Sequence, residues 1–136
     1  MEIPQVYQLS GKRRLFRYPY RLDSIGWMPH HIYEHRNTVI RGCFICLSGN
    51  AEGRSTTMVN GKMQKNEPCR MPHFSFISPG TVMHSLQASY HDELFFHYPE
   101  ECVPALMDFL GPELLAEPGF FFSRLPEQII AEIRRE

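Results

Sequence analysis

The chain has 136 residues, which is enough for one domain with a single hydrophobic core. Its formal net charge is −1, and its densest basic run, Lys12–Arg14, is too short for the basic stripe of a typical nucleic-acid reader. No apolar run reaches the length of a transmembrane helix, and the first residues lack the apolar segment of a secretory signal. We therefore expect a cytoplasmic protein without membrane contact that keeps its four cysteines reduced.

Residues 1–98 are predicted to form a β-barrel domain that starts with an N-terminal arm over about residues 1–25. The arm is weakly patterned, and we expect one or two short strands in it. From residue 39 onward, alternating apolar and polar residues lie between turn motifs, which is typical of a sandwich or barrel. The predicted strands cover residues 39–47, 54–59, 62–65, 73–78, 81–88 and 93–98.

Five turn motifs separate these predicted strands, and one of them is Asn66-Glu67-Pro68. Asn60-Gly61 predicts a two-residue hairpin of type I′, because that turn needs positive φ at both central residues. Pro79-Gly80 predicts a second turn. Residues 48–50 and 89–92 are rich in Ser, Gly, Asn and Asp, and we expect both segments to end strands.

Residues 99–136 show helical spacing in place of strand alternation. Residues 104–110 are apolar at helical intervals, open with proline and are followed by glycine. Residues 112–125 are expected to be irregular, and their phenylalanines at 120–122 to plug one end of the barrel or a dimer seam. A second helix is expected from Pro126 to the end. Its apolar pattern stops at Glu136 without a cap, which favours a fragment of a longer polypeptide over a frayed terminal helix.

Cys43 and Cys46 form a CxxC motif inside a predicted strand. Residues three apart on a strand point to opposite faces, so the two thiols do not meet at one metal without a bulge. We expect both to pack as small hydrophobic residues. Redox or metal chemistry is the alternative.

The segment FISPGTVMHSL, residues 76–86, has a Pro-Gly turn and places His84 five residues after the proline. This layout resembles a cupin, a small antiparallel β-barrel whose metal-binding members use such a histidine as their last ligand. Counted back from Gly49, the other cupin motif would place its ligands at three positions that here hold Arg36, Thr38 and Gly42. A guanidinium repels a divalent metal but donates hydrogen bonds to hydroxyls or carboxylates. The resemblance thus implies an organic ligand and no metal or other cofactor.

The order of motifs resembles the N-terminal, effector-binding half of AraC-type transcriptional regulators. The matching segments begin near Arg36 and are residues 43–49, 76–84, 93–98 and 119–121. The resemblance implies a cupin-like jelly-roll barrel that binds a small polar effector, in particular a sugar. It also implies two C-terminal helices that join a homodimer, and DNA contacts made only by a domain outside this chain.

The candidate ligand-binding residues supply hydrogen bonds from an arginine, a histidine and a hydroxyl, and walls from three aromatic rings: Arg36, His84, Thr38, Trp27, Phe96 and Tyr98. Each has a plainer alternative. Arg36 would form a surface salt bridge, and His84 would be a hydrogen-bonded core or rim residue or a metal ligand. The aromatic residues would pack in the core or under a loop.

Two other functions stay open at this point. A metal-dependent cupin enzyme, of isomerase or dioxygenase type, would use His84 with His30, His31 or His35. A barrel without a ligand would serve only to dimerise. We predict that the chain is not an enzyme, because it has no nucleophile elbow and no pair of carboxylates at the barrel mouth. Glu34 and Glu93 are the only acids near the predicted interior strands.

Overall fold

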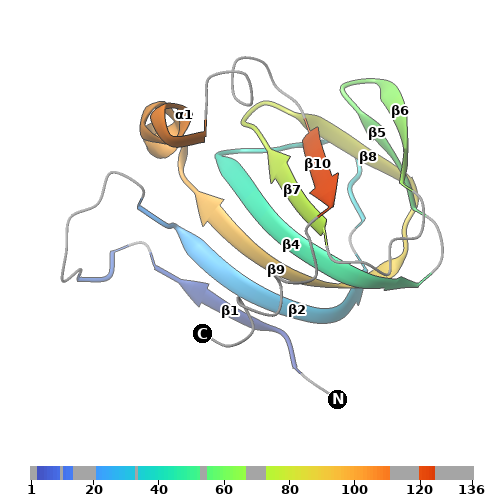
Figure 1. Cartoon of the computed structure of the whole chain (residues 1–136), viewed down its shortest axis with the longest axis horizontal. Helices are drawn as coiled ribbons and strands as arrows, with labels where there is room; N and C mark the ends of the chain where they lie inside the picture. Colours follow the sequence, from blue (N-terminus) through green and yellow to red (C-terminus); the bar gives the residue numbers. More distant parts are fainter. Residues whose placement is uncertain are drawn as a thin grey trace.

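The computed structural model describes residues 3–9, 11–13, 21–32, 34–52, 55–66, 73–110 and 120–124. These residues are mainly β, as predicted, and their strands are antiparallel and arranged in two sheets (Figure 1). No closed barrel is detected among the described strands. No helix in this part of the chain is long and apolar enough to cross a bilayer.

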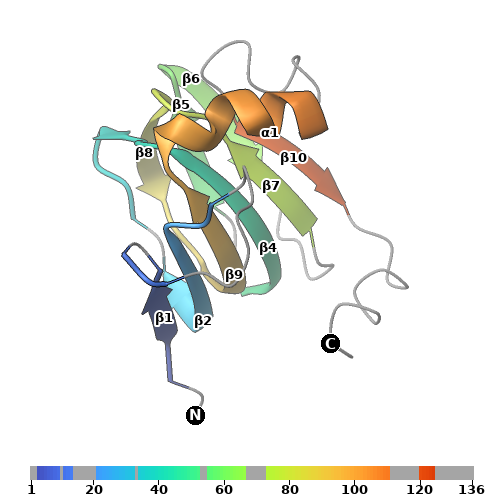
Figure 2. The same cartoon turned by 90° about the vertical axis from the view of Figure 1, so that its left-hand side faces the viewer.

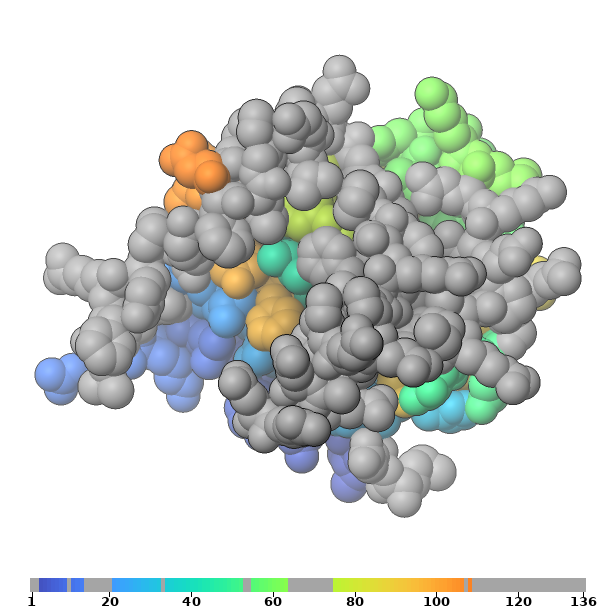
Figure 3. All heavy atoms as spheres, in the orientation of Figure 1, coloured from blue at the N-terminus to red at the C-terminus, as the bar shows by residue number. Residues whose placement is uncertain are grey.

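The larger sheet has six strands in the order β1-β2-β9-β4-β7-β10. Their bounds are β1 (Gln5–Gln8), β2 (Ser24–Ile32), β4 (Cys43–Glu52), β7 (His73–Ile77), β9 (Tyr90–Tyr98) and β10 (Phe120–Arg124). The smaller sheet has the order β3-β8-β5-β6. Its strands are β3 (Thr38–Val39), β5 (Ser55–Val59), β6 (Lys62–Asn66) and β8 (Val82–Gln87). The edge strand β1 and the β5–β6 hairpin lie at opposite sides of the molecule (Figure 3).

One face of the larger sheet, called the helix face here, packs against the helical segment that follows β9. This segment is the 3-10 helix η1 (Glu100–Cys102) followed by α1 (Val103–Leu110), which lies across one end of the strands (Figure 2). Cys43 and Phe76 are fully buried there against Cys102 and Leu106. The first predicted C-terminal helix is confirmed. The second, from Pro126, lies outside the described residues.

The opposite face, called the inner face here, looks onto the smaller sheet. Ile77 of β7 forms a buried cluster with Ile40 and with Met83 of β8, and the half-buried Phe44 of β4 packs against it. Because Met83 belongs to the smaller sheet, this cluster joins the two sheets into a two-layer sandwich. The side chains between the layers therefore come from alternate residues of strands in both sheets.

The two predicted Gly turns have the expected backbone. Asn60 and Gly61 have φ of 50° and 77°, as a type I′ turn requires, and they join β5 to β6. Gly80 has a φ of 81° after Pro79, which suits the third position of a type II turn. The Thr81 hydroxyl, fully buried, donates to the Ser78 carbonyl at 2.8 Å and secures this turn.

Several predicted boundaries are wrong. The strands β4 and β9 continue through residues 48–50 and 90–92, where turns were expected, because β-bulges absorb the extra residues. The arm contains β1, a short strand as expected, but β2 begins at the end of the arm and extends to Ile32 over residues that no predicted strand covers. Pro29 beside its bulge obscures the strand pattern. Residues 120–124 form the edge strand β10 and are not irregular, which agrees with the strand preference of phenylalanine.

Gly42 occupies a position that admits no side chain. Its φ is 72°, and a Cβ there would lie 2.4 Å from the Tyr98 carbonyl oxygen and 2.7 Å from Nε2 of His97. A metal ligand at this position, as the cupin pattern would have it, is therefore sterically excluded. Gly61 offers a comparison, because its φ is also positive but a Cβ there would meet no atom within 4 Å.

We predict that Gly42→Ala lowers the free energy of unfolding by about 3 kcal/mol or more, since it adds a backbone clash to the cost of a left-handed conformation. Gly61→Ala should cost only about 1–2 kcal/mol, from the backbone conformation alone. Urea unfolding of both variants measures the difference. Equal losses would show that the contact with Tyr98 and His97 does not constrain the fold.

Candidate functional site

The sequence-predicted residues Arg36, Thr38 and His84 gather on and beside β3 and β8. Arg36 and Thr38 are exposed, and the Arg36 backbone N–H donates to Oγ1 of Thr38 at 3.3 Å. Nδ1 of His84 accepts a hydrogen bond from the Asn37 backbone N–H at 3.2 Å. By strand alternation His84 points away from the face of β8 that holds the buried Met83, so it lies on the outer side of the smaller sheet.

The aromatic candidates lie on the helix face of the larger sheet. Tyr98 packs against the Cys43–Cys102 cluster, and burial, followed by those two thiols, raises its pKa. Phe96 lies two residues before Tyr98 on β9, so alternation places it on the same face. Trp27 pairs with Leu94 and therefore shares that face too. The structure thus does not bring these three aromatic residues together with Arg36, Thr38 and His84.

The space between the sheets changes from apolar to polar along the strands β4 and β9 of the larger sheet. On β4 the inner-face residues run from Phe44 through Cys46 to Ser48, and on β9 from Phe95 to Glu93. The smaller sheet follows the same order, because Met83 is succeeded on its face by Ser85 of β8. We call the Ser48–Glu93 side of the sandwich the polar end. His97, beyond Phe95, departs from this order at the apolar end, where it contacts Asp23 and the Arg41 carbonyl. The strand β2 departs from it too, because Ser24 lies opposite His97 and Met28 lies opposite Glu93.

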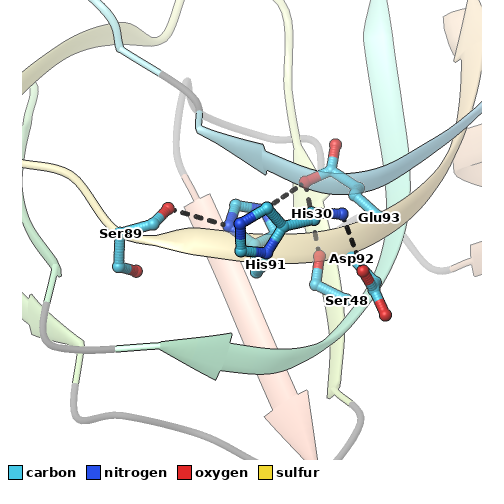
Figure 4. Close-up of polar contacts among 6 residues, drawn as sticks. All are labelled: His30, Ser48, Ser89, His91, Asp92 and Glu93. Atoms are coloured by element: carbon cyan, nitrogen blue, oxygen red, sulfur yellow. Dashed lines mark hydrogen bonds and ion pairs between the residues drawn. The ribbon is translucent and has the colours of Figure 1, made fainter. Parts of the chain in front are cut away.

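Glu93 is the centre of the polar end (Figure 4). Its Oε2 accepts a hydrogen bond from the Ser48 hydroxyl at 3.3 Å and lies 3.0 Å from Nε2 of His91. The side chains of Glu93 and His91 are 12% and 19% exposed, so the pair is mostly buried without being sealed from solvent. Nδ1 of His91 lies 3.4 Å from the Ser89 carbonyl oxygen, which leaves both ring nitrogens facing acceptors.

The pKa of His91 reflects this setting. Burial alone would lower it, but the hydrogen bond and the negative charge of Glu93 outweigh burial, with smaller contributions from the Ser89 carbonyl and Asp92. The net result is a raised pKa. The fold therefore favours the protonated imidazole at this position.

His35 approaches Glu93 from the smaller-sheet side. Its backbone N–H donates to the Ser85 hydroxyl at 3.0 Å, and its carbonyl accepts from the Ser85 N–H at 2.8 Å. Burial lowers the pKa of His35, and the charge of Glu93 only partly offsets this. The polar end thus has a neutral imidazole on one side of the carboxylate and an imidazole that favours its proton on the other.

Cys46 closes the inner side of the polar end. Burial and then the charge of Glu93 raise the pKa of its thiol, and its side chain hydrogen-bonds with Ser75 and Glu93. Cys43 lies on the helix face, where burial and then Cys102 raise its pKa to about 12. The two cysteines therefore point to opposite faces, as their spacing predicts, and neither favours the reactive thiolate.

Asp92, the neighbour of Glu93, holds both strands that flank β9. One carboxylate oxygen of Asp92 accepts a hydrogen bond from the backbone N–H of His30 at 2.8 Å. The other oxygen accepts a hydrogen bond from the side-chain amide of Asn50, also at 2.8 Å. His30 and Asn50 have φ of 44° and 53° and lie in the bulges of β2 and β4. The bulge in β2 sets the register in which His31, and not His30, pairs with His91.

Within the described ranges, no group of three or more His, Cys, Asp or Glu side chains is arranged to hold a metal ion. Of the histidines suggested for a metal enzyme, His31 pairs with His91 and His35 lies near Glu93, whereas His30 and His84 lie elsewhere. His30 stacks on Tyr90 with ring centroids 4.6 Å apart, and His84 lies on the outer side of β8.

The chain matches no family model, and no curated protein matches it significantly. The candidate site is therefore defined by the geometry of the polar end alone.

Glu93 was noted only as one of two acids near predicted interior strands, and Ser48, His91 and Ser85 were not among the predicted site residues. A usable signal exists in the alternation His91-x-Glu93-x-Phe95, which places polar and apolar residues on one strand face. It was hidden because residues 89–92 resemble a turn. The pairing of Ser85 with His35 joins residues 50 apart in sequence and has no local signal.

We predict that His91→Gln destabilises the protein by about 1–2 kcal/mol near pH 5.5, because a charge-assisted hydrogen bond to Glu93 is lost. The folded pKa of His91 lies above its usual 6.5. Its contribution to stability is thus complete below pH 6.5 and is lost as the pH rises through the folded value. The difference in the free energy of unfolding between wild type and variant should therefore be smaller near pH 8.5 than near pH 5.5. Urea unfolding at several pH values measures it.

Glu93→Gln supplies the control for this prediction. In a double-mutant cycle the coupling between positions 91 and 93 should be larger near pH 5.5 than near pH 8.5. A coupling that does not change with pH would contradict the pairing of a protonated His91 with Glu93.

Proposed function

We propose that this chain is the effector-binding and dimerisation domain of an AraC-type transcriptional regulator with a cupin-like jelly-roll fold. The two-layer antiparallel sandwich and the helix that directly follows its last central strand support this proposal. The proposal also includes a cytoplasmic location and no membrane contact. DNA would be contacted by a helix-turn-helix domain in a longer polypeptide, and C-terminal helices would pair two copies.

The observation that carries the proposal is the mostly buried, hydrogen-bonded carboxylate of Glu93 between the two sheets. Burying a charge costs free energy, and clusters of ionisable groups with shifted pKa values concentrate at functional sites. His35 and His91 show such shifts, in opposite directions. An apolar end beside a polar end also suits a molecule with both hydroxyl groups and C–H surfaces, such as a sugar.

In this proposal the effector binds at the polar end and contacts both sheets. Glu93 and Ser48 would contact it from the larger sheet, and His35 and Ser85 from the smaller one. Arg36, with Thr38, would lie at the exposed rim. No metal or other cofactor takes part.

The arrangement of His91 favours binding over catalysis. A general base needs a free acceptor nitrogen within reach of the substrate. Both nitrogens of His91 already face acceptors, on Glu93 and Ser89. An effector that bridges the two sheets would favour one spacing of the layers, and α1 packs directly on the larger sheet. A change in that spacing would move α1, and through α1 it would change the position of the helices that pair the subunits.

Substitutions of His35 and His84, which lie on opposite sides of the smaller sheet, test this proposal by their effects on ligand affinity. Isothermal titration calorimetry with a panel of neutral monosaccharides and polyols should find a ligand for the wild-type chain. We expect His35→Gln to weaken its binding by about tenfold or more, because one hydrogen bond to the ligand is lost. His84→Gln, the matched control, should change the affinity by less than about twofold.

The reverse result, with binding lost in His84→Gln and kept in His35→Gln, would place the site on the outer side near Arg36. Failure of every panel member to bind the wild-type chain would contradict the role of a polar-effector domain. Stoichiometric metal in the purified protein would favour the metal-dependent cupin enzyme.

A further inference from the structure

We infer that Glu93 determines which ligands the proposed site accepts: its carboxylate receives a hydroxyl or ammonium group and excludes ligands that present a carboxylate or phosphate there. This inference rests on the proposed function, because it names the ligand class of the same site. If Arg36 lined the site, as the sequence predicts, its guanidinium would attract anionic ligands, whereas a site centred on Glu93 repels them.

The position of Glu93 supports this selectivity. The Ser48 hydroxyl and the His91 ring both approach the same oxygen, Oε2. A carboxylate has two oxygens with about four acceptor positions in all, so Glu93 has capacity for a donor beyond Ser48, His91 and the Cys46 thiol. At 12% exposure the side chain is accessible from solvent, yet buried enough that its charge is weakly screened.

The surrounding groups do not reverse this preference near neutral pH. His91 faces Glu93 and Ser89, so its donors are directed at the protein and away from a ligand. His35 has a lowered pKa and is neutral in this range, so it offers no positive charge to an anion. The cation predicted at the site, Arg36, is exposed on the segment before β3. A ligand carboxylate next to Glu93 would therefore meet a like charge, while the positive charge of a protonated His91 is directed at Glu93 and not at the ligand.

Ligands that differ only in charge provide the test. The probes are D-glucose, D-glucosamine and D-glucuronate, together with the corresponding galactose set, titrated by calorimetry at pH 7.5. We expect the neutral or ammonium member of a set to bind at least about tenfold more tightly than the carboxylate member. In Glu93→Gln, which keeps the shape and an acceptor oxygen, this difference should fall below about threefold.

Glu52→Gln is the matched control. It removes the same charge from an exposed position on β4, whose side chain lies 3.8 Å from His30. The charge preference should be unchanged in this variant. Because the order of affinities in the wild-type chain is itself a result, the test does not depend on the folding of any variant.

Three outcomes decide the inference. The inference is supported if the wild-type chain binds the neutral or ammonium member more tightly than the carboxylate member, and if this preference is lost in Glu93→Gln and kept in Glu52→Gln. Equal or tighter binding of the carboxylate member, or a preference that persists in Glu93→Gln, overturns the inference and leaves the proposed function standing. Binding of no member to the wild-type chain overturns both.

Discussion

A carboxylate placed between two packed sheets is the constraint on which this structure depends. Glu93 is removed from most of its water, and so it needs hydrogen-bond donors and a nearby positive charge. Ser48 and His91 meet this need, and the carboxylate in turn favours the protonated form of His91. Without these partners the interior could not hold a charge. With them, the sandwich acquires a polar end that an apolar core alone would not have.

Glu93 and Asp92 are adjacent carboxylates with different roles, because alternation sends them to opposite faces of β9. Asp92 bonds to the bulge residues His30 and Asn50, one in each flanking strand. Burial tends to raise the pKa of Asp92, but these bonds outweigh it and lower the value. Asp92 thus fixes the registers of β2 and β4 against β9, and these registers place side chains beside Glu93.

The mainly β, antiparallel character of the chain and most strands were predictable from sequence, because their signals are local, whereas the predicted closed barrel is not detected among the described strands. Turns such as Asn60-Gly61 need particular backbone angles, and alternation marks half-buried strands. The extent of β4 and β9 was not predictable, because Gly49 and Asn50 resemble a turn when the bulge and the Asp92 contact are unknown.

The candidate site was predictable only in outline. An interior ligand site without metal was the expectation, and Glu93 was noted with Glu34 as an acid near the predicted interior strands, without a role in the site. The contacts that define the polar end join residues 45 and 50 apart, Ser48 with Glu93 and His35 with Ser85. Such pairings depend on register and sheet order, which composition and spacing do not specify. The roles predicted for Arg36, Thr38, His84, Trp27, Phe96 and Tyr98 stay predictions.

The central claim is that a small polar molecule binds between the sheets at Glu93. The most direct measurement is NMR of the histidine side chains while a ligand from the sugar panel is added. The account predicts that the ring signals of His35 and His91 shift with ligand concentration, while those of His30 and His84 keep their positions. Shifts confined to His84, or a ligand that binds without moving either interior histidine, would contradict it.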